Sequence, residues 1–420
     1  MQTDKLLCQV SPDEILSNLA ELGQLCFEVT DACNLACDYC VYRDLFSDHD
    51  PRNGKMMDFG LVKRLLDYLV ELWDQHPTGK VNDYTAISFY GGEPLLNMPL
   101  IKRTIEYIEG LHLKRIIRFN LTTNATLLDR HIDYLVEKEF NLLISLDGDQ
   151  LSDRHRRYHS GKESFIDVFS NAKKLKERYP DYFREKVQFN AVLHNYNDVE
   201  PIVQFMKREF GKVPSISEIN PRGLDPEKKK EYLAMYNNFY TSLDRVKDAD
   251  YLVEEMGFSH PETEDLIRYM RYVGGNYYSG YFSLLSNTLM RPNRPAPGTC
   301  SPFQKKMFVT VNGKILQCER IGHNFSLGTV SADRIDLNLD QISERFNGWV
   351  NGLSKSCLHC GNLGICQRCF FNVYGVETAR PVCQFHSPTG KLNMISRDSR
   401  AFVAKHPELF YKIIESYSIQ

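Results

Sequence analysis

Short apolar segments alternate with amphipathic segments through the first half of the chain, and this alternation sharply limits the folds open to it. Helices are predicted at 59–75, 98–112, 127–138, 164–178 and 197–210, and strands at 25–30, 85–92, 115–123, 141–148, 187–195 and 215–220. Strands that alternate with helices pair in parallel through right-handed crossovers. We therefore expect an α/β fold, a partial (β/α)6 TIM-like barrel whose last helix follows residue 225.

Polar motifs recur where these strands end. They read TDAC, YGGEP, TTNAT and SLDGD. In barrels of this kind the active site lies at the carboxyl ends of the strands, because all of these ends meet on one face. The sequence therefore predicts a functional site built from these four motifs.

The first motif opens a cysteine triplet with the spacing C-x3-C-x2-C, made of Cys33, Cys37 and Cys40. Three thiolates can hold three irons of a four-iron cluster. Structural zinc, the alternative, needs four ligands, and His49 is the only histidine or cysteine within twenty residues after Cys40. An iron left without a protein ligand could bind a molecule with adjacent amine and carboxylate groups.

The stretch CNLACDYC, including Tyr39 before the third cysteine, resembles the signature of the radical S-adenosylmethionine (radical SAM) enzymes. The resemblance implies a [4Fe-4S] cluster on the triplet and SAM on its open iron. It also implies that GGEP (Gly91, Gly92, Glu93 and Pro94) meets the amino group of SAM. Glycines allow close approach of the backbone, and a carboxylate pairs with an ammonium. The alternative interpretation of GGEP is a tight turn.

Other strand ends match the family more loosely. Thr123 and Asn124 resemble a Thr-Asn-Gly motif in which Ala125 replaces the glycine, and Ser145 and Asp147 resemble a strand that contacts ribose. An arginine that approaches the SAM carboxylate corresponds to Arg156, although Arg157 is adjacent. Each of these could instead be a turn residue or a surface charge.

A second group of cysteines lies near the end of the chain, and no cysteine lies between Cys40 and Cys300. The array C-x12-G-x4-C, with Gly313 as its glycine, followed by C-x2-C-x5-C-x2-C and a last cysteine, resembles the SPASM domain. That domain follows the radical SAM barrel and carries two auxiliary [4Fe-4S] clusters, which makes three clusters in all. The resemblance assigns Cys300, Cys318 and Cys369 to auxiliary cluster I, and Cys357, Cys360, Cys366 and Cys383 to auxiliary cluster II.

The array departs from this family in two places. Two residues rather than three precede Cys369, and the stretch SPFQKKMF after Cys300 contains no further cysteine. Auxiliary cluster I is therefore expected to have an open iron, which could bind a substrate thiolate, or a ligand other than cysteine. Cys8 or Cys26 could complete it instead, although Cys26 is predicted to be a buried core thiol.

Glu319 directly follows Cys318, where sulfatase-maturating relatives have an aspartate that acts as a base on the substrate. A shielded carboxylate could have that role here. The alternative is a structural ion pair with Arg320 or Arg368.

The domains expected are an N-terminal extension (1–24), the radical SAM barrel (25–224), a tyrosine-rich helical insert (225–298), the SPASM domain (299–386) and a helical C-terminal segment (387–420). The insert could offer contact area to a peptide, or simply pack as helices. A net charge of −3 gives no reason to expect nucleic acid or membrane as a partner. No apolar run reaches the roughly 18 residues of a membrane helix, and no secretion signal is present, which favours the cytoplasm of an anaerobic or low-oxygen bacterium.

The resemblance implies a peptide maturase. Such an enzyme cleaves SAM reductively to a 5′-deoxyadenosyl radical, abstracts hydrogen from a ribosomally made precursor peptide, and forms a thioether, carbon–carbon or ether crosslink. Its electron donor would be external, such as flavodoxin or ferredoxin. Because few residues precede the first strand, a separate protein could bind the leader. The alternatives are an anaerobic sulfatase-maturating enzyme that forms formylglycine, and a non-catalytic zinc-binding interaction protein.

Overall fold

The computed structural model describes residues 9–76, 84–247, 249–273, 299–361, 366, 368–378, 380–388 and 392–418. The chain forms two compact units. The barrel unit comprises Asp13–Val246 and Phe303–Leu339, and the helical unit comprises Met1–Pro12, Lys247–Pro302 and Asp340–Gln420.

The barrel unit contains one ten-stranded sheet with the order β10-β9-β8-β7-β1-β2-β3-β4-β5-β6. Its first six strands pair in parallel, each with the next. They are β1 (Gln24–Thr30), β2 (Tyr84–Gly91), β3 (Ile116–Thr123), β4 (Asn141–Ser145), β5 (Val187–Leu193) and β6 (Ser215–Glu218). The predicted α/β fold is confirmed. The sheet ends at β10 and β6, so the barrel is partial rather than closed.

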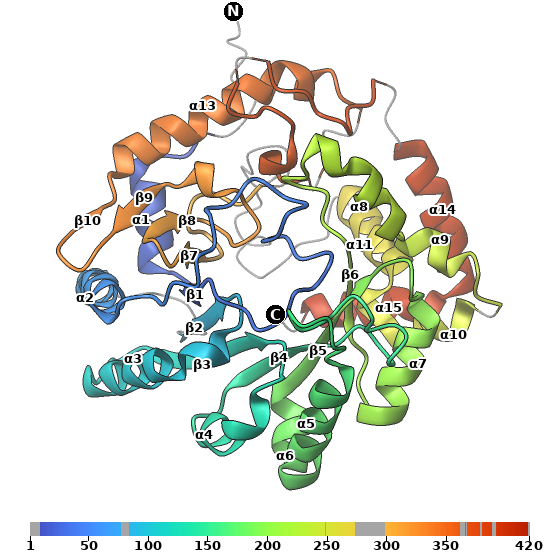
Figure 1. Ribbon diagram of the computed structural model, residues 1–420. Coiled ribbons are helices and arrows are strands. Elements are labelled where there is room, and N and C mark those ends of the chain that lie inside the picture. Colours follow the sequence, from blue (N-terminus) through green and yellow to red (C-terminus); the bar gives the residue numbers. More distant parts are fainter. Residues whose placement is uncertain are drawn as a thin grey trace, which may run out of the picture. The chain divides into compact units, whose positions relative to one another are not determined.

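Helices lie along the outer side of these strands (Figure 1). They are α2 (Phe59–Gln75), α3 (Met98–Gly110), α4 (Ile132–Glu137), α5 (Phe165–Arg178), α6 (Pro180–Lys186) and α7 (Val199–Phe210). The side chain of Asp58 caps the first turn of α2 by accepting from Gly60 N–H. Gly211, with φ of 68°, ends α7 in the left-handed conformation that glycine tolerates.

Two of these elements differ from the prediction. The helix expected at 127–138 is divided into a 3-10 turn (Leu128–Arg130) and the short α4. Helix α6 was not predicted, and it begins at Pro180, whose fixed φ suits the first helical position. After β6 the chain continues as α8 (Lys229–Met235) and α9 (Phe239–Leu243).

Residues 303–339 extend the barrel sheet. Strand β7 (Met307–Val309) pairs in parallel with β1, while β8 (Lys314–Leu316), β9 (Gly328–Val330) and β10 (Ile335–Asp336) continue from it as an antiparallel meander. The first part of the expected SPASM domain therefore packs within the barrel unit. Gly313 makes the turn between β7 and β8 with φ of 80°.

The helical unit contains α10 (Ala249–Met256), α11 (Pro261–Val273), most of α13 (Leu339–Leu358), α14 (Leu392–Lys405) and α15 (Pro407–Ser418). Four of these helices share a buried cluster made of Val253, Leu266, Phe402, Leu409 and Ile413. Helix α15 confirms the expected terminal helix. Residues 274–298, the last part of the tyrosine-rich insert, lie outside the described residues. Within the described part of the chain, no helix has the length and apolar character needed to cross a membrane.

Candidate active site

The cysteine triplet lies in the loop that follows β1, and its three thiols are close together. Cys33 and Cys37 are both affected electrostatically by Cys40, and Cys37 also by Cys33. Burial raises the pKa of the Cys33 thiol to about 11 and that of Cys37 to about 12. Because neutral thiols are the favoured form here, ionisation requires a compensating positive charge, as a bound metal provides.

His49 does not join the triplet as a fourth ligand. Its Nδ1 lies 2.9 Å from the carbonyl oxygen of Asp50, and its ring meets that of Tyr42 edge-on at 5.8 Å. Among the described residues, no three Cys, His, Asp or Glu side chains converge as ligands of a single metal ion do. His49 therefore supplies no fourth ligand for zinc at the triplet.

The two glycines of GGEP allow β2 to end directly against the cysteine loop. A Cβ on Gly92 would lie 2.1 Å from the carbonyl oxygen of Ala32, and a Cβ on Gly91 would lie 2.2 Å from that of Thr30. The backbone N–H of Glu93 donates to Ala32 at 2.8 Å. Only glycine fits this close approach, which explains the motif in physical terms.

Glu93 is fully buried, and both of its carboxylate oxygens accept hydrogen bonds. Oε1 accepts from the Thr123 hydroxyl at 2.7 Å and from Leu95 N–H at 3.1 Å, and Oε2 accepts from Asn124 N–H at 2.7 Å. Burial nevertheless raises the pKa of Glu93 to about 7. The structure thus brings the ends of β2 and β3 together around one carboxylate.

Asn124 connects this carboxylate with the cysteine loop. Its side-chain amide lies 3.8 Å from the Cys33 sulfur and donates to Asn34 at 2.9 Å. Ala125, where the family has glycine, adopts a φ of 58°. The left-handed conformation costs a non-glycine residue roughly 1–2 kcal/mol. Ala125 nevertheless keeps the left-handed backbone that a glycine could adopt at this position.

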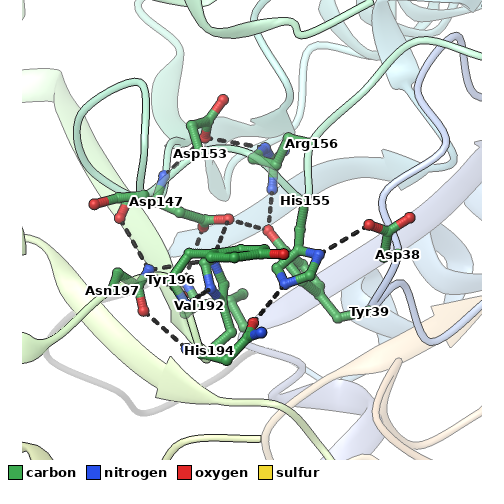
Figure 2. Close-up of polar contacts among 12 residues, drawn as sticks. Asp38, Tyr39, Asp147, Asp153, His155, Arg156, Val192, His194, Tyr196 and Asn197 are labelled. Atoms are coloured by element: carbon green, nitrogen blue, oxygen red, sulfur yellow. Dashed lines mark hydrogen bonds and ion pairs between the residues drawn. The ribbon is translucent and has the colours of Figure 1, made fainter. Parts of the chain in front are cut away.

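Arg156 and Arg157 differ in burial and in their partners. Arg156 is buried and donates to the Tyr39 hydroxyl at 3.1 Å, and that hydroxyl donates to Asp147 (Figure 2). The Nε atom of Arg156 is buried without a hydrogen-bond partner in the described structure. Arg157 instead lies at the surface beside Asp38. Tyr39, Asp147 and Arg156 therefore form one group. Ser145, also predicted at this site, is the last residue of β4.

Two further side chains complete this group and were not predicted. His194, which directly follows β5, is fully buried, and its Nε2 lies 3.6 Å from Asp147. Its ring stacks on that of Tyr39 with a centroid distance of 5.6 Å. Asp153 accepts from the backbone N–H of Asp147 at 3.1 Å, and burial raises its pKa well above the usual range. The only sequence signal for His194 was its position at a strand end.

Glu319 is paired with Lys306, a partner that the sequence did not suggest. The Lys306 ammonium lies 3.0 and 3.2 Å from the two carboxylate oxygens, whereas Arg320 is 3.9 Å away. Although burial opposes ionisation, Lys306 holds the pKa of Glu319 below its usual value. Cys26 is buried on β1 as predicted, and its environment includes Glu319, Lys306 and Cys318.

In the helical unit, the four cysteines assigned to auxiliary cluster II lie near one another. The Cys357 thiol is affected by the charges of Cys366, Cys383 and Cys360, and burial raises its pKa to about 11. The assignment of these cysteines as ligands stays a prediction. Cys300 and Cys369 belong to the helical unit and Cys318 to the barrel unit, so auxiliary cluster I also remains a prediction. Cys8 lies outside the described residues.

Comparison with known proteins identifies the class to which this fold and site belong. The model of the Radical SAM superfamily matches residues 27–208. That range contains the cysteine loop, the glycine turn and the strand ends described above. Residues 27–208 therefore form a radical SAM domain, and this class of domain implies SAM and a [4Fe-4S] cluster.

Three similar proteins refine this placement. An uncharacterized protein of Methanocaldococcus jannaschii (MJ0907) is 34% identical over 148 residues, 35% of this chain and 46% of that protein. The cysteine-type anaerobic sulfatase-maturating enzyme of Clostridium novyi is 24% identical over 242 residues, 55% of this chain and 60% of the enzyme. The chain thus spans about half the length of these curated relatives. The solved structure "Native anSMEcpe with bound AdoMet and Kp18Cys peptide" shares the fold at 18% identity, with a TM-score of 0.57 over 93% of this chain and 99% of that one.

Proposed function

We propose that this radical SAM enzyme modifies a ribosomally made peptide by abstracting a hydrogen atom and forming a thioether, carbon–carbon or ether crosslink. The observation that carries the proposal is the meeting of three thiols, the buried Glu93 and the buried Arg156 at the carboxyl ends of neighbouring strands. Arg156 affects the pKa of Glu93, of Cys33 and of Cys37, so these groups share one buried region.

The side chains present fit the cofactors that this class implies. Cys33, Cys37 and Cys40 would hold the cluster, and the described region offers no fourth thiol to close it. The Glu93 carboxylate would pair with the amine of SAM, and Arg156 would serve its carboxylate, since its Nε makes no hydrogen bond and lies 3.8 Å from Asp153. When bound together, these groups supply the reductive cleavage of SAM that generates a 5′-deoxyadenosyl radical. The chain itself binds, orients and excludes water, as proteins do for cofactor chemistry.

A peptide substrate is supported by the relatives. One is the cysteine-type anaerobic sulfatase-maturating enzyme of Clostridium novyi, and the solved neighbour was determined with a peptide and AdoMet. Two auxiliary clusters on the C-terminal cysteines would accept electrons during oxidation of the substrate. The external electron donor, a flavodoxin or ferredoxin, and a separate leader-binding protein belong to the same proposal.

Formation of formylglycine is the second candidate, and the similarity to sulfatase-maturating enzymes favours it. The two candidates make different demands on Glu319. If Glu319 acts as a base, its ion pair with Lys306 must open so that the carboxylate can accept a proton from substrate. If Glu319 is structural, the ion pair stays closed. Replacement of Glu319 by Gln therefore helps to separate the two.

The test uses the anaerobically reconstituted chain, SAM, dithionite, and two peptide sets encoded beside related genes: short repeated peptides and sulfatase-derived peptides. Formation of 5′-deoxyadenosine with loss of hydrogen from a short peptide, and no reaction with an aldehyde-specific hydrazide, supports crosslinking. A hydrazide-reactive product from a sulfatase peptide would support the second candidate. No peptide-dependent change with either set, despite SAM cleavage, would reject both.

A further inference from the structure

Residues 154–159 of the barrel unit form a short segment that runs antiparallel to the cysteine loop and makes hydrogen bonds to its backbone. Ala36 N–H donates to the carbonyl oxygen of Arg157, and Asp38 N–H donates to that of His155 at 3.1 Å. Leu35 and Tyr158 form an antiparallel bridge next to the first of these contacts. The loop thus has a regular pairing partner although it is not itself a strand.

Side chains from the same segment add a second set of contacts. Arg157 Nη2 donates to both oxygens of Asp38 at 2.6 and 2.7 Å. His155 Nδ1 lies 2.9 Å from Oδ2 of the same carboxylate (Figure 2). His159 Nε2 lies 2.9 Å from the carbonyl oxygen of Cys33. Asp38 directly follows Cys37 in the sequence. These contacts therefore hold the part of the loop that carries the cysteine triplet.

The contacts are anchored in the body of the sheet. His155 is buried, and its Nε2 lies 2.8 Å from the side-chain oxygen of Asn195, two residues after β5. Asn195 N–H in turn donates at 2.8 Å to Met235, the last residue of α8. A continuous path of hydrogen bonds therefore connects Asp38 with two rigid elements.

We propose that Arg157 is a positioning residue which, together with His155, holds Asp38 and keeps the Cys33–Cys40 loop in a ligand-ready conformation before the cluster is assembled. Ordering a free loop costs conformational entropy that metal binding would otherwise have to offset. A loop that is already ordered in the metal-free chain avoids this cost. The inference rests on the proposed assignment of Cys33, Cys37 and Cys40 as cluster ligands.

Hydrogen exchange on the metal-free, full-length chain tests the inference without SAM or iron. Arg157→Ala is expected to speed exchange of the Ala36 and Asp38 amides roughly three- to tenfold, because a charge-assisted contact on a half-exposed side chain is lost. Arg157→Lys should restore most of the protection, since one nitrogen of Arg157 makes both contacts to Asp38.

The matched control is Arg154→Ala. Arg154 comes from the same segment and is similarly exposed, but it lies 3.9 Å from Glu163 and over the ring of Tyr196. It should leave exchange of the loop unchanged. Unchanged exchange in Arg157→Ala, or equal acceleration in Arg154→Ala, would overturn the inference. If Arg157→Ala does not fold, Asp38→Asn, which removes the charge that Arg157 pairs with, provides the comparison.

Release of iron to a chelator from the oxidised, reconstituted protein gives the second measurement. Arg157→Ala should lose about one cluster's iron several-fold faster than the wild type, with Arg154→Ala unchanged. If the ligand assignment itself is wrong, Cys37→Ala keeps all of its iron. If only the positioning role is wrong, Cys37→Ala loses iron while Arg157→Ala releases it at the wild-type rate.

Discussion

The carboxylate of Glu93 accepts a hydrogen bond from the backbone N–H of Asn124 at 2.7 Å and so connects the ends of two adjacent parallel strands. Because Glu93 is completely buried, its ionisation is linked to the stability of the whole strand-end region. That linkage gives the chain a pH dependence that can be measured without any cofactor.

In the metal-free chain, Glu93 keeps its proton up to about pH 7, compared with an ordinary pKa of 4.5. The folded state therefore binds more protons than the unfolded state between these values, and stability falls as the pH rises through this range. The contribution lost is on the order of 3 kcal/mol at full extent. Urea unfolding at pH 5, 6, 7 and 8 measures it, and Glu93→Gln should flatten the slope. An equally steep slope in the variant would assign the effect to another group.

Replacement of Cys37 by Ala should abolish formation of 5′-deoxyadenosine under dithionite, because a cluster held by two thiolates is not retained. Cys26→Ala is the control, since that thiol is buried on β1 and takes no part in the triplet. It is expected to retain most of the SAM cleavage of the wild type. Product is quantified by chromatography, and full activity in Cys37→Ala would refute the assignment of this ligand.

Anaerobic reconstitution with iron and sulfide should give about twelve irons per chain if all three clusters form. Cys357→Ser should lower this number by about four, since Cys357 lies beside Cys360, Cys366 and Cys383. Iron and zinc are measured together. Two or three zinc ions per chain, with no absorbance of iron–sulfur type, would instead support the zinc-binding interaction protein.

Gly313→Ala should destabilise the barrel unit by about 3 kcal/mol or more, because both the space and the conformation oppose a side chain. A Cβ at this position would lie 2.0 Å from the carbonyl oxygen of Val330, and φ is 80°. Gly161 has a similar φ of 85° with no atom within 4 Å of the added Cβ. Gly161→Ala should thus cost only about 1 kcal/mol. Equal losses in thermal unfolding would show that the clash at Gly313 is relieved.

Lys306→Met should reduce the free energy of unfolding at pH 7 by about 3 kcal/mol, since it leaves the largely buried Glu319 carboxylate without its partner. Lys63 pairs with Asp67 on the surface of α2 at 2.7 Å. Lys63→Met, as the control, should leave the stability almost unchanged, because this ion pair is exposed to solvent. A loss restored by the double variant Lys306→Met/Glu319→Leu would confirm that the unpaired charge is the cause.

Hydrophobic periodicity was sufficient to predict the six parallel strands, because most of them carry a run of buried side chains. Periodicity did not predict α6, whose seven residues, mostly polar, follow α5 with only Tyr179 between them. The strands β7 to β10 were also not predicted. They are two or three residues long, too short for an alternating pattern to be visible.

The candidate site was predictable where chemistry requires a particular residue at a fixed spacing, as in the cysteine triplet and the glycine turn. Contacts between distant segments were not. Adjacent arginines carry the same sequence signal, and only the path of the backbone directs Arg156 inward and Arg157 toward Asp38. Likewise, the pairing of Lys306 with Glu319 depends on the β7–β8 hairpin, which brings residues thirteen positions apart together.

The pairing of β7 with β1 has a consequence for how the protein is made. Phe27 lies opposite Val309. One edge of β1 therefore stays unpaired until β7 leaves the ribosome, roughly 280 residues later. At translation speeds of about 5–20 residues per second, the nascent chain exposes this edge for roughly 15–60 s. Chaperones that shield unpaired strands during synthesis should therefore raise the yield of the full-length protein. The increase should be larger than for a shortened chain that ends before β7.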